Sequence, residues 1–450
     1  MHRQIAQRFD IAETETVFLK VAVGRYNTPP HRGAMKPRVV VTGMGAVSPN
    51  GIGREEFWKA TAAGRSGVRR ITRFDPSGLQ VQIAGEVTDF DEASYVEGRE
   101  RKHVSRAVPL GLAAVREALQ DAGIEHRTMT RDQLRRIGMM VGSGGGSAEF
   151  TEEQYRLYYA GHEKQCSVYT IPTSTIGTMA SEFSMRFGFR GPSHVVSTGC
   201  TSSTDAIGYA CQHIASGDQD VMVVGGVDAP IAPLLMRGFI MMRIMTTRWN
   251  EEPERGSRPF SRDRDGFVLA EGAWFLVLEN IEHARARGAH IYGEIAGYAS
   301  TCEAYHRVQL EECGEEPAYT IGLALEKAGI PPAEVQYLNY HGTSTPLNDR
   351  IETRAVKLAF NSHAFKLAGS SLKSLIGHPQ GACGAAGVVS TLLAMRDGVL
   401  PPTLNVEEPD PECDLDYVPD RGRRLDIEWA VCNCIAFGSK NSALVVRNVR

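Results

Sequence analysis

Long apolar runs are missing from this chain of 450 residues. No segment approaches the roughly 18 consecutive apolar residues that cross a bilayer, and the amino terminus has no basic stretch followed by an apolar core and a cleavage site. An excess of charge is missing as well, since 49 basic and 53 acidic residues leave a formal net charge of -4. We therefore expect a soluble, unexported protein that binds neither a membrane nor nucleic acid.

A regular cysteine framework is also lacking. The nine cysteines are an odd number scattered along the chain, which predicts reduced thiols and a cytoplasmic setting. The CNC triplet at 432–434 is too short and too isolated to indicate a zinc site. The Gly-rich stretch at 142–147 has neither the Lys-Ser/Thr ending of a P-loop nor the spacing of a dinucleotide fingerprint. We expect no metal and no cofactor.

The chain does contain an alternation of short β-rich apolar runs with longer helical patterns. Strands are predicted at 38–43, 137–144, 194–199, 220–226, 273–279, 291–300 and 335–342, and as two runs within 430–446. Helices are predicted between them, at 106–123, 202–216, 318–329 and 381–396. This rhythm is typical of α/β layers with buried sheets.

Three regions are distinguished along the chain. Residues 1–34 show no convincing strand or helix pattern, and we expect an N-terminal extension there that is disordered, an arm, a partner-binding segment or the product of an early start codon. A break near ENIEHARARGAH divides the remainder into a longer unit, 35–284, and a shorter unit, 285–450. No flexible linker separates these two units, which indicates that they pack closely.

A single cysteine stands out in SHVVSTGCTSSTDA, residues 193–206. Cys200 follows an apolar run and precedes small residues that open the helix predicted at 202–216. Unpaired backbone N–H groups and the helix dipole favour an anion at such a junction, and they can lower the pKa of a thiol. The alternative is an inert, buried cysteine at a turn.

Three further sites supply groups that complement a thiol. His341 ends a β-rich run and is followed by hydroxyl residues, Lys373 and His378 lie in a Gly-rich segment before an apolar helix, and Phe437 and Gly438 form a turn between two β-rich runs. Each of these has an ordinary structural interpretation when taken alone. Together they offer a nucleophile, proton or hydrogen-bond donors and a backbone turn that can face an oxyanion, which favours acyl transfer.

At these residues the chain resembles the β-ketoacyl synthases of the thiolase superfamily. The similarity extends from Met35 to Arg450 and rests on motifs in the family's order: STGCTSS, SRPFSRDRDGFVLAEGA, YHGTSTPLND, KSLIGHPQGACGAAG and a terminal Phe-Gly turn. Within the family it most resembles the catalytic ketosynthase subunit of bacterial type II polyketide synthases. The resemblance implies a five-layered αβαβα fold built from two similar halves, with Cys200 on a nucleophile elbow.

The resemblance also implies roles for these residues. Cys200 would accept an acyl chain as a thioester, and neutral His341 and His378 would stabilise the enolate formed when malonyl decarboxylates. The backbone N–H groups of Cys200 and Phe437, at the turn with Gly438, would meet the oxyanion. The remaining implied roles are a cluster of Lys373 with Asp349 and Glu352, contacts of Thr343 and Thr345 with a pantetheine arm, a gate at Phe437 and a channel-lining Phe239.

The implied partners are an acyl carrier protein and either a chain-length-factor paralogue, giving a heterodimer, or a second copy of the chain. No cofactor is implied, since the substrates are carried on the phosphopantetheine arm of the carrier. Ser439 and Lys440 depart from the Gly-Gly-Thr-Asn ending that is usual in the family, which concerns the gate more than the chemistry.

Four other functions stay open at this point. They are a homodimeric 3-oxoacyl carrier-protein synthase II of fatty-acid synthesis, a noncatalytic chain-length factor, a cysteine hydrolase using Cys200, His341 and Asn339, and a degradative thiolase using Cys434.

Overall fold

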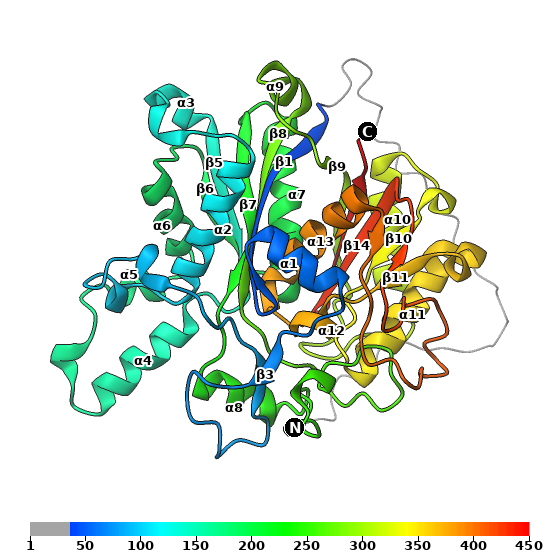
Figure 1. Cartoon of the computed structure of the whole chain (residues 1–450), viewed down its shortest axis with the longest axis horizontal. Helices are drawn as coiled ribbons and strands as arrows, with labels where there is room; N and C mark the ends of the chain where they lie inside the picture. Colours follow the sequence, from blue (N-terminus) through cyan, green and yellow to red (C-terminus); the bar gives the residue numbers. More distant parts are fainter. Residues whose placement is uncertain (1–36, 450) are drawn as a thin grey trace, which may run out of the picture. The chain divides into compact units, whose positions relative to one another are not determined.

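Two five-stranded halves with the same topology make up the computed structural model, which describes residues 37–449 (Figure 1). The expected extension at 1–34 lies outside the described residues. The strands of the first half are β1 (Val39–Ser48), β5 (Ile137–Gly142), β6 (Ser193–Val196), β7 (Val221–Asp228) and β8 (Gly272–Asn280). Those of the second half are β9 (Gly293–Cys302), β10 (Tyr337–Asn339), β11 (Ala368–Ser370), β14 (Trp429–Ala436) and β15 (Lys440–Arg447).

The strand order is the same in each half. In the first it is β6-β5-β7-β8-β1 and in the second β11-β10-β14-β15-β9, with the first three strands parallel and the last two antiparallel to their neighbours. The two halves join where β1 pairs with β9, at Val40 with Glu294 and Val41 with Gly293. The short strands β2 (Gly51–Ile52), β3 (Val68–Arg70), β4 (Ile83–Gly85), β12 (Val399–Leu400) and β13 (Arg423–Arg424) lie outside this repeat.

The helices repeat in the same manner. Those of the first half are α2 (Ala107–Asp121), α6 (Thr178–Phe187) and α7 (Ser202–Ala215), and their counterparts are α10 (Glu315–Ala328), α11 (Pro346–Phe360) and α13 (Cys383–Asp397). Helices outside the repeat are α1 (Arg54–Ala62), α3 (Arg131–Arg135), α4 (Ala148–Tyr159), α5 (Thr170–Ser174), α8 (Pro233–Met241), α9 (Ile281–Ala286) and α12 (Lys373–Ile376). No helix among the described residues is long and apolar enough to cross a membrane.

Helices α7 and α13 form the central layer. They contact each other and the strands of both sheets, while α2 and α6 cover the outer face of the first sheet and α10 packs on the outer face of the second beside α11 (Figure 1). This burial on every side explains why α13 has 13 buried residues out of 15. The expected five-layered αβαβα arrangement of two similar halves is confirmed, and the predicted strands and long helices occur close to their expected positions.

The two central helices approach closely at their amino ends because Gly384 has no side chain. A Cβ atom at Gly384 would lie 2.1 Å from Thr204 Oγ1 and 2.8 Å from Thr204 N. A Cβ atom at this position can be accommodated only if one of the two buried helices moves. The contact therefore fixes the start of α13 against the start of α7.

We predict that Gly384→Ala lowers the stability of the fold by about 1–3 kcal/mol, since the added methyl group overpacks the α7–α13 contact. The measurement is the shift of the urea or thermal unfolding midpoint. Gly322→Ala in α10 is the matched control, because a Cβ there meets nothing within 4 Å and alanine is the better helix former. Equal or higher stability of Gly384→Ala would contradict the packing argument.

Candidate active site

Cys200 lies between β6 and α7. Strand β6 ends at Val196, residues Gly199–Thr201 form a 3-10 turn, and α7 begins at Ser202. Gly199 has φ +71°, a left-handed conformation that glycine adopts without a steric penalty. The turn carries Cys200 to the amino end of a buried helix, as the sequence predicts.

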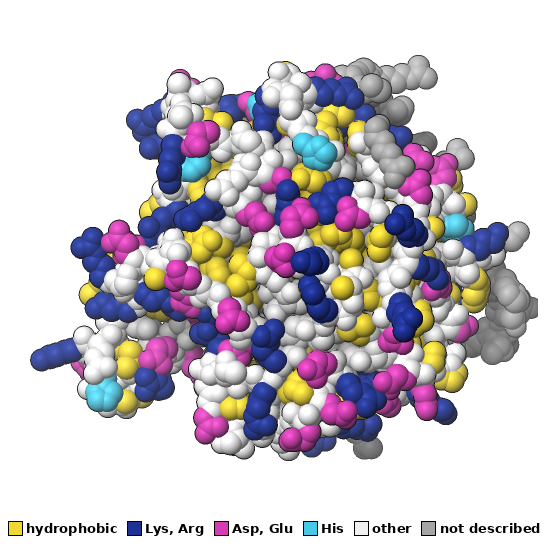
Figure 2. Space-filling model, viewed as in Figure 1, with side chains coloured by type: hydrophobic (Ala, Val, Ile, Leu, Met, Phe, Trp, Pro, Cys, Tyr) yellow, Lys and Arg dark blue, Asp and Glu magenta, His cyan; other side chains and the backbone are white. Residues whose placement is uncertain are grey.

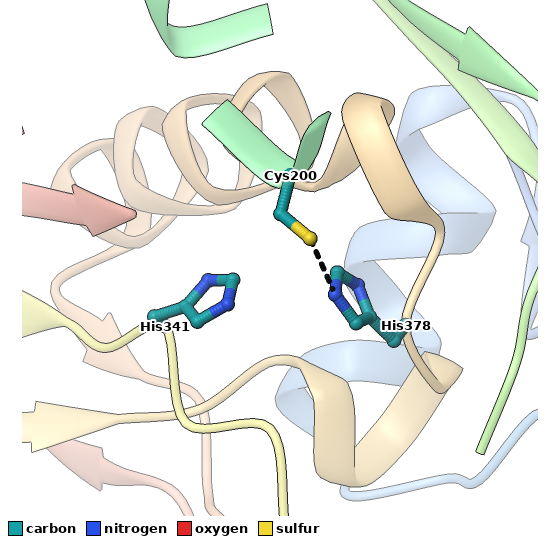
Figure 3. Close-up of side chains that lie close together, drawn as sticks. All are labelled: Cys200, His341 and His378. Atoms are coloured by element: carbon teal, nitrogen blue, oxygen red, sulfur yellow. Dashed lines mark hydrogen bonds between the residues drawn. The ribbon is translucent and has the colours of Figure 1, made fainter. Parts of the chain in front are cut away.

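Two histidines from the second half face this cysteine (Figure 3). His341 follows β10, and His378 lies between α12 and α13. The Nε2 atom of His378 is 3.2 Å from the Sγ atom of Cys200, and the two imidazole rings lie 5.5 Å apart at 85° to each other. The structure thus brings together three residues that are far apart in the chain.

Lys373 sets the protonation of His341. The Lys373 Nζ atom is 3.3 Å from His341 Nδ1 and also donates to the His341 carbonyl oxygen. Because an ammonium group only donates, Nδ1 accepts and the proton of the neutral ring lies on Nε2. Burial, followed by the charge of Lys373, lowers the pKa of His341 to about 3, and burial also lowers the pKa of His378. Both rings are therefore neutral near pH 7, as expected.

The acidic residues do not form the expected cluster with Lys373. Glu352 accepts from the backbone N–H groups of His341 and Gly342, each at 2.7 Å, and from Asn433. Asp349 accepts from Phe260 N and pairs with Arg264. Among the described residues no carboxylate lies within ion-pair distance of Lys373. Glu352 therefore holds the backbone around His341, and Asp349 holds Phe260 and Arg264.

The expected low pKa of Cys200 is wrong for the resting enzyme. Burial raises the pKa of the Cys200 thiol to about 12, and the charge of Lys373 offsets only part of this increase. The local pattern reveals the helix end but not the depth of burial, and here burial dominates. Cys200 is thus a thiol in the resting enzyme.

One cavity of about 320 Å³ connects this cysteine with the surface. Several predicted residues line it, namely Cys200, His341, Thr343, Thr345, His378 and Phe437. Phe239 is absent from this lining, because it lies on α8 and packs edge-on against Phe267 at 5.6 Å. Phe267 lines the cavity itself and stands edge-on to His378, and the channel-lining role of Phe239 stays a prediction.

The Phe437 turn lies against the nucleophile. The Phe437 backbone N–H donates to Cys200, while the Gly438 N–H is taken by the Arg307 carbonyl at 3.0 Å. Gly438 therefore contributes its left-handed conformation, φ +82°, and not a donor. Ser439 is left-handed too, and its hydroxyl accepts from Tyr305 N and His306 N, which ties the turn to the loop after β9.

Several residues of the site were not predicted from the sequence. Asp228 accepts hydrogen bonds from the Ser143 hydroxyl and from the backbone N–H groups of Gly144, Gly145 and Gly381. The Gly-rich stretch at 142–147 therefore has a structural role, because Asp228 ties it to the segment before α13. Cys383 and Cys434 lie beside Cys200. Cys383 lies within the motif KSLIGHPQGACGAAG, and its place at the first residue of α13, close after His378, is the signal that could have revealed it.

The hydrolase arrangement of Cys200, His341 and Asn339 is not formed. The Asn339 side chain packs against α13, where its Oδ1 atom would lie 2.4 Å from a Cβ atom at Gly387. His341 Nδ1 instead faces Lys373, so no amide orients the ring as a cysteine hydrolase requires.

Comparison with known families gives two matches that together span most of the chain. The family model described as Beta-ketoacyl synthase, N-terminal domain, matches residues 36–284, and that described as Beta-ketoacyl synthase, C-terminal domain, matches residues 292–407. The 3-oxoacyl-acyl-carrier-protein synthase 2 of Synechocystis sp. is 40% identical over 412 residues, which are 92% of this chain and 98% of that protein. A polyketide beta-ketoacyl synthase 1 described for Streptomyces cyaneus is 43% identical over 423 residues, 92% of this chain and 98% of that protein.

Solved structures of ketosynthases are also similar to this chain. A chain of the ishigamide ketosynthase/chain length factor is similar with a TM-score of 0.85 and 32% identity, covering 92% of this chain and all 100% of that chain. A chain from a type II polyketide synthase acyl-carrier protein in complex with its ketosynthase, bound to the hexaketide, has a TM-score of 0.83 and 33% identity with the same coverage.

Because the pKa of Cys200 is raised, its thiolate fraction increases about tenfold per pH unit throughout the neutral range. We predict that alkylation of Cys200 by iodoacetamide accelerates continuously from pH 6 to pH 9, without a plateau. The measurement is peptide mapping by mass spectrometry, with the exposed Cys302 in the same digest as a control for the reagent. A rate that is already constant between pH 6 and pH 8 would show a thiolate in the resting enzyme and contradict the dominance of burial.

Proposed function

The chain belongs to the β-ketoacyl synthase family of condensing enzymes, and from this premise we propose that it is the catalytic ketosynthase subunit of a bacterial type II polyketide synthase. The proposal rests on one observation: Cys200, His341 and His378 line the same cavity, and the Nε2 atom of His378 is 3.2 Å from the sulfur of Cys200. The reaction is the decarboxylative condensation of a malonyl unit, held by an acyl carrier protein, with an acyl chain on Cys200.

The first step is transfer of the acyl chain to Cys200. The sulfur attacks the thioester carbonyl of the acylated carrier, the new S–C bond forms, and the carrier thiolate leaves and takes up the cysteine proton. The Nε2–H group of His378 is positioned to donate to the sulfur and to stabilise its developing negative charge while the proton moves to the carrier. The backbone N–H groups of Cys200 and Phe437 face the oxyanion, and the amino end of α7 adds favourable electrostatics.

The second step uses the neutral histidines. Malonyl enters on a second carrier and loses carbon dioxide, leaving its electron pair as an enolate on the thioester oxygen. His341 has its proton on Nε2, since Lys373 occupies Nδ1, and His378 is neutral as well. Two neutral N–H donors stabilise charge that appears only during the step, which is where stabilisation accelerates a reaction.

The third step joins the two chains. The enolate carbon attacks the thioester on Cys200, the oxyanion again lies against the N–H groups of Cys200 and Phe437, and collapse expels the Cys200 thiolate. The lengthened β-ketoacyl chain stays on the carrier. Thr343 and Thr345, whose hydroxyls are 2.8 Å apart on the cavity wall, are placed to hydrogen-bond the pantetheine arm.

The mouth of the cavity suits an acidic carrier. Arg243 is exposed and lines the cavity, and Arg307 is exposed next to the lining residues Val308 and Gln309. The face shown in Figure 2 mixes both signs of charge. Opposite charges at the mouth favour rapid, reversible docking of the carrier.

A paralogous partner would cover the free edge of the first sheet. The terminal strand β6 is only partly buried, whereas β11 at the other end is buried. Helices α4 and α5 project beyond the sheet on the same side (Figure 1), and this region exposes Tyr159 at 82%, Val168 at 81% and Ile171 at 77%. An open strand edge with apolar neighbours is characteristic of a subunit interface.

A second candidate is a homodimeric 3-oxoacyl-acyl-carrier-protein synthase 2, favoured by the 40% identity with the Synechocystis protein of that name. The noncatalytic chain-length factor is disfavoured, because the nucleophile and both histidines are present and assembled. A cytoplasmic location stays a prediction, supported by nine cysteines that are all free.

Two substitutions separate the half-reactions. We predict that Cys200→Ala abolishes condensation but retains malonyl decarboxylation, since the histidines remain, whereas His341→Ala lowers decarboxylation by about 10²- to 10³-fold and still permits acylation of Cys200. The measurement is intact-protein mass spectrometry of carrier and enzyme, with His290→Ala, an exposed histidine, as the matched control. Elongation by Cys200→Ala would refute the assigned nucleophile.

We further predict that coexpression with a chain-length-factor paralogue gives a 1:1 complex that elongates a malonyl-derived chain beyond the length made by the chain alone. Native mass spectrometry gives the stoichiometry and intact-carrier mass spectrometry the chain length. A homodimer that is fully active without a paralogue would instead establish the fatty-acid alternative.

A further inference from the structure

The nucleophile belongs to a buried cluster of three thiols. Cys200, Cys383, Cys434 and Ala436 form a buried group of their own, in which Cys383 is 7% and Cys434 is 2% exposed. The condensing reaction described above uses only the sulfur of Cys200. The other two sulfurs therefore call for a separate explanation.

The two unused sulfurs converge on His341. Cys383 Sγ and Cys434 Sγ are 3.5 Å apart, and Cys434 Sγ is 3.5 Å from His341 Nδ1. All three ligand-type atoms lie within 4.8 Å of one another. They come from three elements of the second half, α13, β14 and the segment after β10.

These separations match the edges of a small tetrahedral coordination shell. Zinc is bound at about 2.3 Å by thiolate sulfur and about 2.0–2.1 Å by imidazole nitrogen, so neighbouring ligands lie about 3.5–3.8 Å apart. The observed 3.5 Å spacings need only small movements to reach that geometry. Thiolate and imidazole together select a thiophilic ion over magnesium or calcium.

A fourth ligand is available from the backbone. The Cys200 carbonyl oxygen is 3.2 Å from Cys383 Sγ and 3.0 Å from Cys434 Sγ. It faces both sulfurs and completes a cage of two sulfurs, one nitrogen and one oxygen. The Cys200 side chain is not part of this cage.

We propose that Cys383, Cys434 and His341 form a site for one thiophilic d10 cation, and that binding of this cation stops condensation. Zn²⁺ is the probe for the site. Both sulfurs bind the ion as thiolates, and any proton that they carry is released to solvent as Zn²⁺ enters. The ion reaches the site through the cavity, whose wall includes Cys200, His341 and His378.

Lys373 competes with the ion. Its ammonium group occupies the acceptor side of His341 Nδ1 at 3.3 Å, so it must withdraw when a cation binds there. The withdrawal removes the contact that orients His341, and the metal pulls on the Cys200 carbonyl. The inhibitory effect rests on the proposed function, whereas binding of the ion does not.

The binding test uses Co²⁺ as a spectroscopic substitute for Zn²⁺ on the reduced full-length protein. We expect one equivalent to give the thiolate-to-cobalt charge-transfer and d–d bands of tetrahedral coordination, and we expect Zn²⁺ to displace it. Cys383→Ser and Cys434→Ser should each weaken binding by at least about 100-fold, because they remove a ligand. Cys432→Ala, a buried cysteine on the same strand that contacts Thr391, should leave the spectrum unchanged.

Two more variants distinguish this cage from a site built on the nucleophile. Cys200→Ala should keep the spectrum, since only its backbone oxygen is used, and Lys373→Met should bind more tightly, since the competing charge is gone. Loss of the spectrum in Cys200→Ala with retention in Cys383→Ser would overturn the proposal, and so would the absence of charge-transfer bands in the unaltered protein.

Inhibition is measured as the ratio of condensation rates with and without one equivalent of Zn²⁺, each protein serving as its own reference. The ratio should fall at least about tenfold for the unaltered protein and stay near one for Cys383→Ser. Binding without inhibition would overturn the regulatory half of the proposal. A chain inactive in condensation would refute the proposed function instead, while the cobalt spectrum would still decide the site.

Discussion

The contact between the amino ends of α7 and α13 is the constraint on which the rest of the site depends. Gly384 permits it, because a Cβ atom there would lie 2.1 Å from Thr204 Oγ1. The contact fixes the start of α7, which follows directly on the turn that carries Cys200, against the start of α13, which follows His378. Duplication of one β/α unit thus yields two buried helices whose starts meet, and the chemistry is distributed between them: the nucleophile belongs to the first half and both histidines to the second.

Electrostatics inside this junction follow from burial more than from charge pairing. Cys200 and the two histidines are neutral because water is excluded. Lys373 is the cation of the cluster, and its contacts are with His341 and not with a carboxylate. A neutral resting site suits a reaction in which negative charge appears only transiently, first at the thioester carbonyl and then on the enolate.

Local patterns were sufficient for much of the fold and for part of the site. The β-branched run at β1 and the apolar stripe of α7 predicted their elements closely, and the motifs around Cys200, His341 and His378 predicted residues that the structure brings together. Burial depth and the direction of side chains could not be derived in this way. The pKa of Cys200, the bonding of Glu352 to backbone N–H groups and the position of Phe267 in the cavity wall all depend on packing between distant segments. The convergence of Cys383 and Cys434 is of the same kind, because 51 residues separate them.

The central claim is that the first helix turn after β6 presents one sulfur to an oxyanion site formed by two backbone N–H groups. A crystal structure of the acyl-enzyme, trapped with a nonextendable acyl carrier protein substrate, tests it most directly. The account predicts an acyl chain on Cys200 Sγ, with its carbonyl oxygen within hydrogen-bond distance of the Cys200 and Phe437 N–H groups and with both imidazoles free to meet malonyl. An acyl chain on Cys383 or Cys434, or a carbonyl oxygen directed away from Phe437, would contradict it.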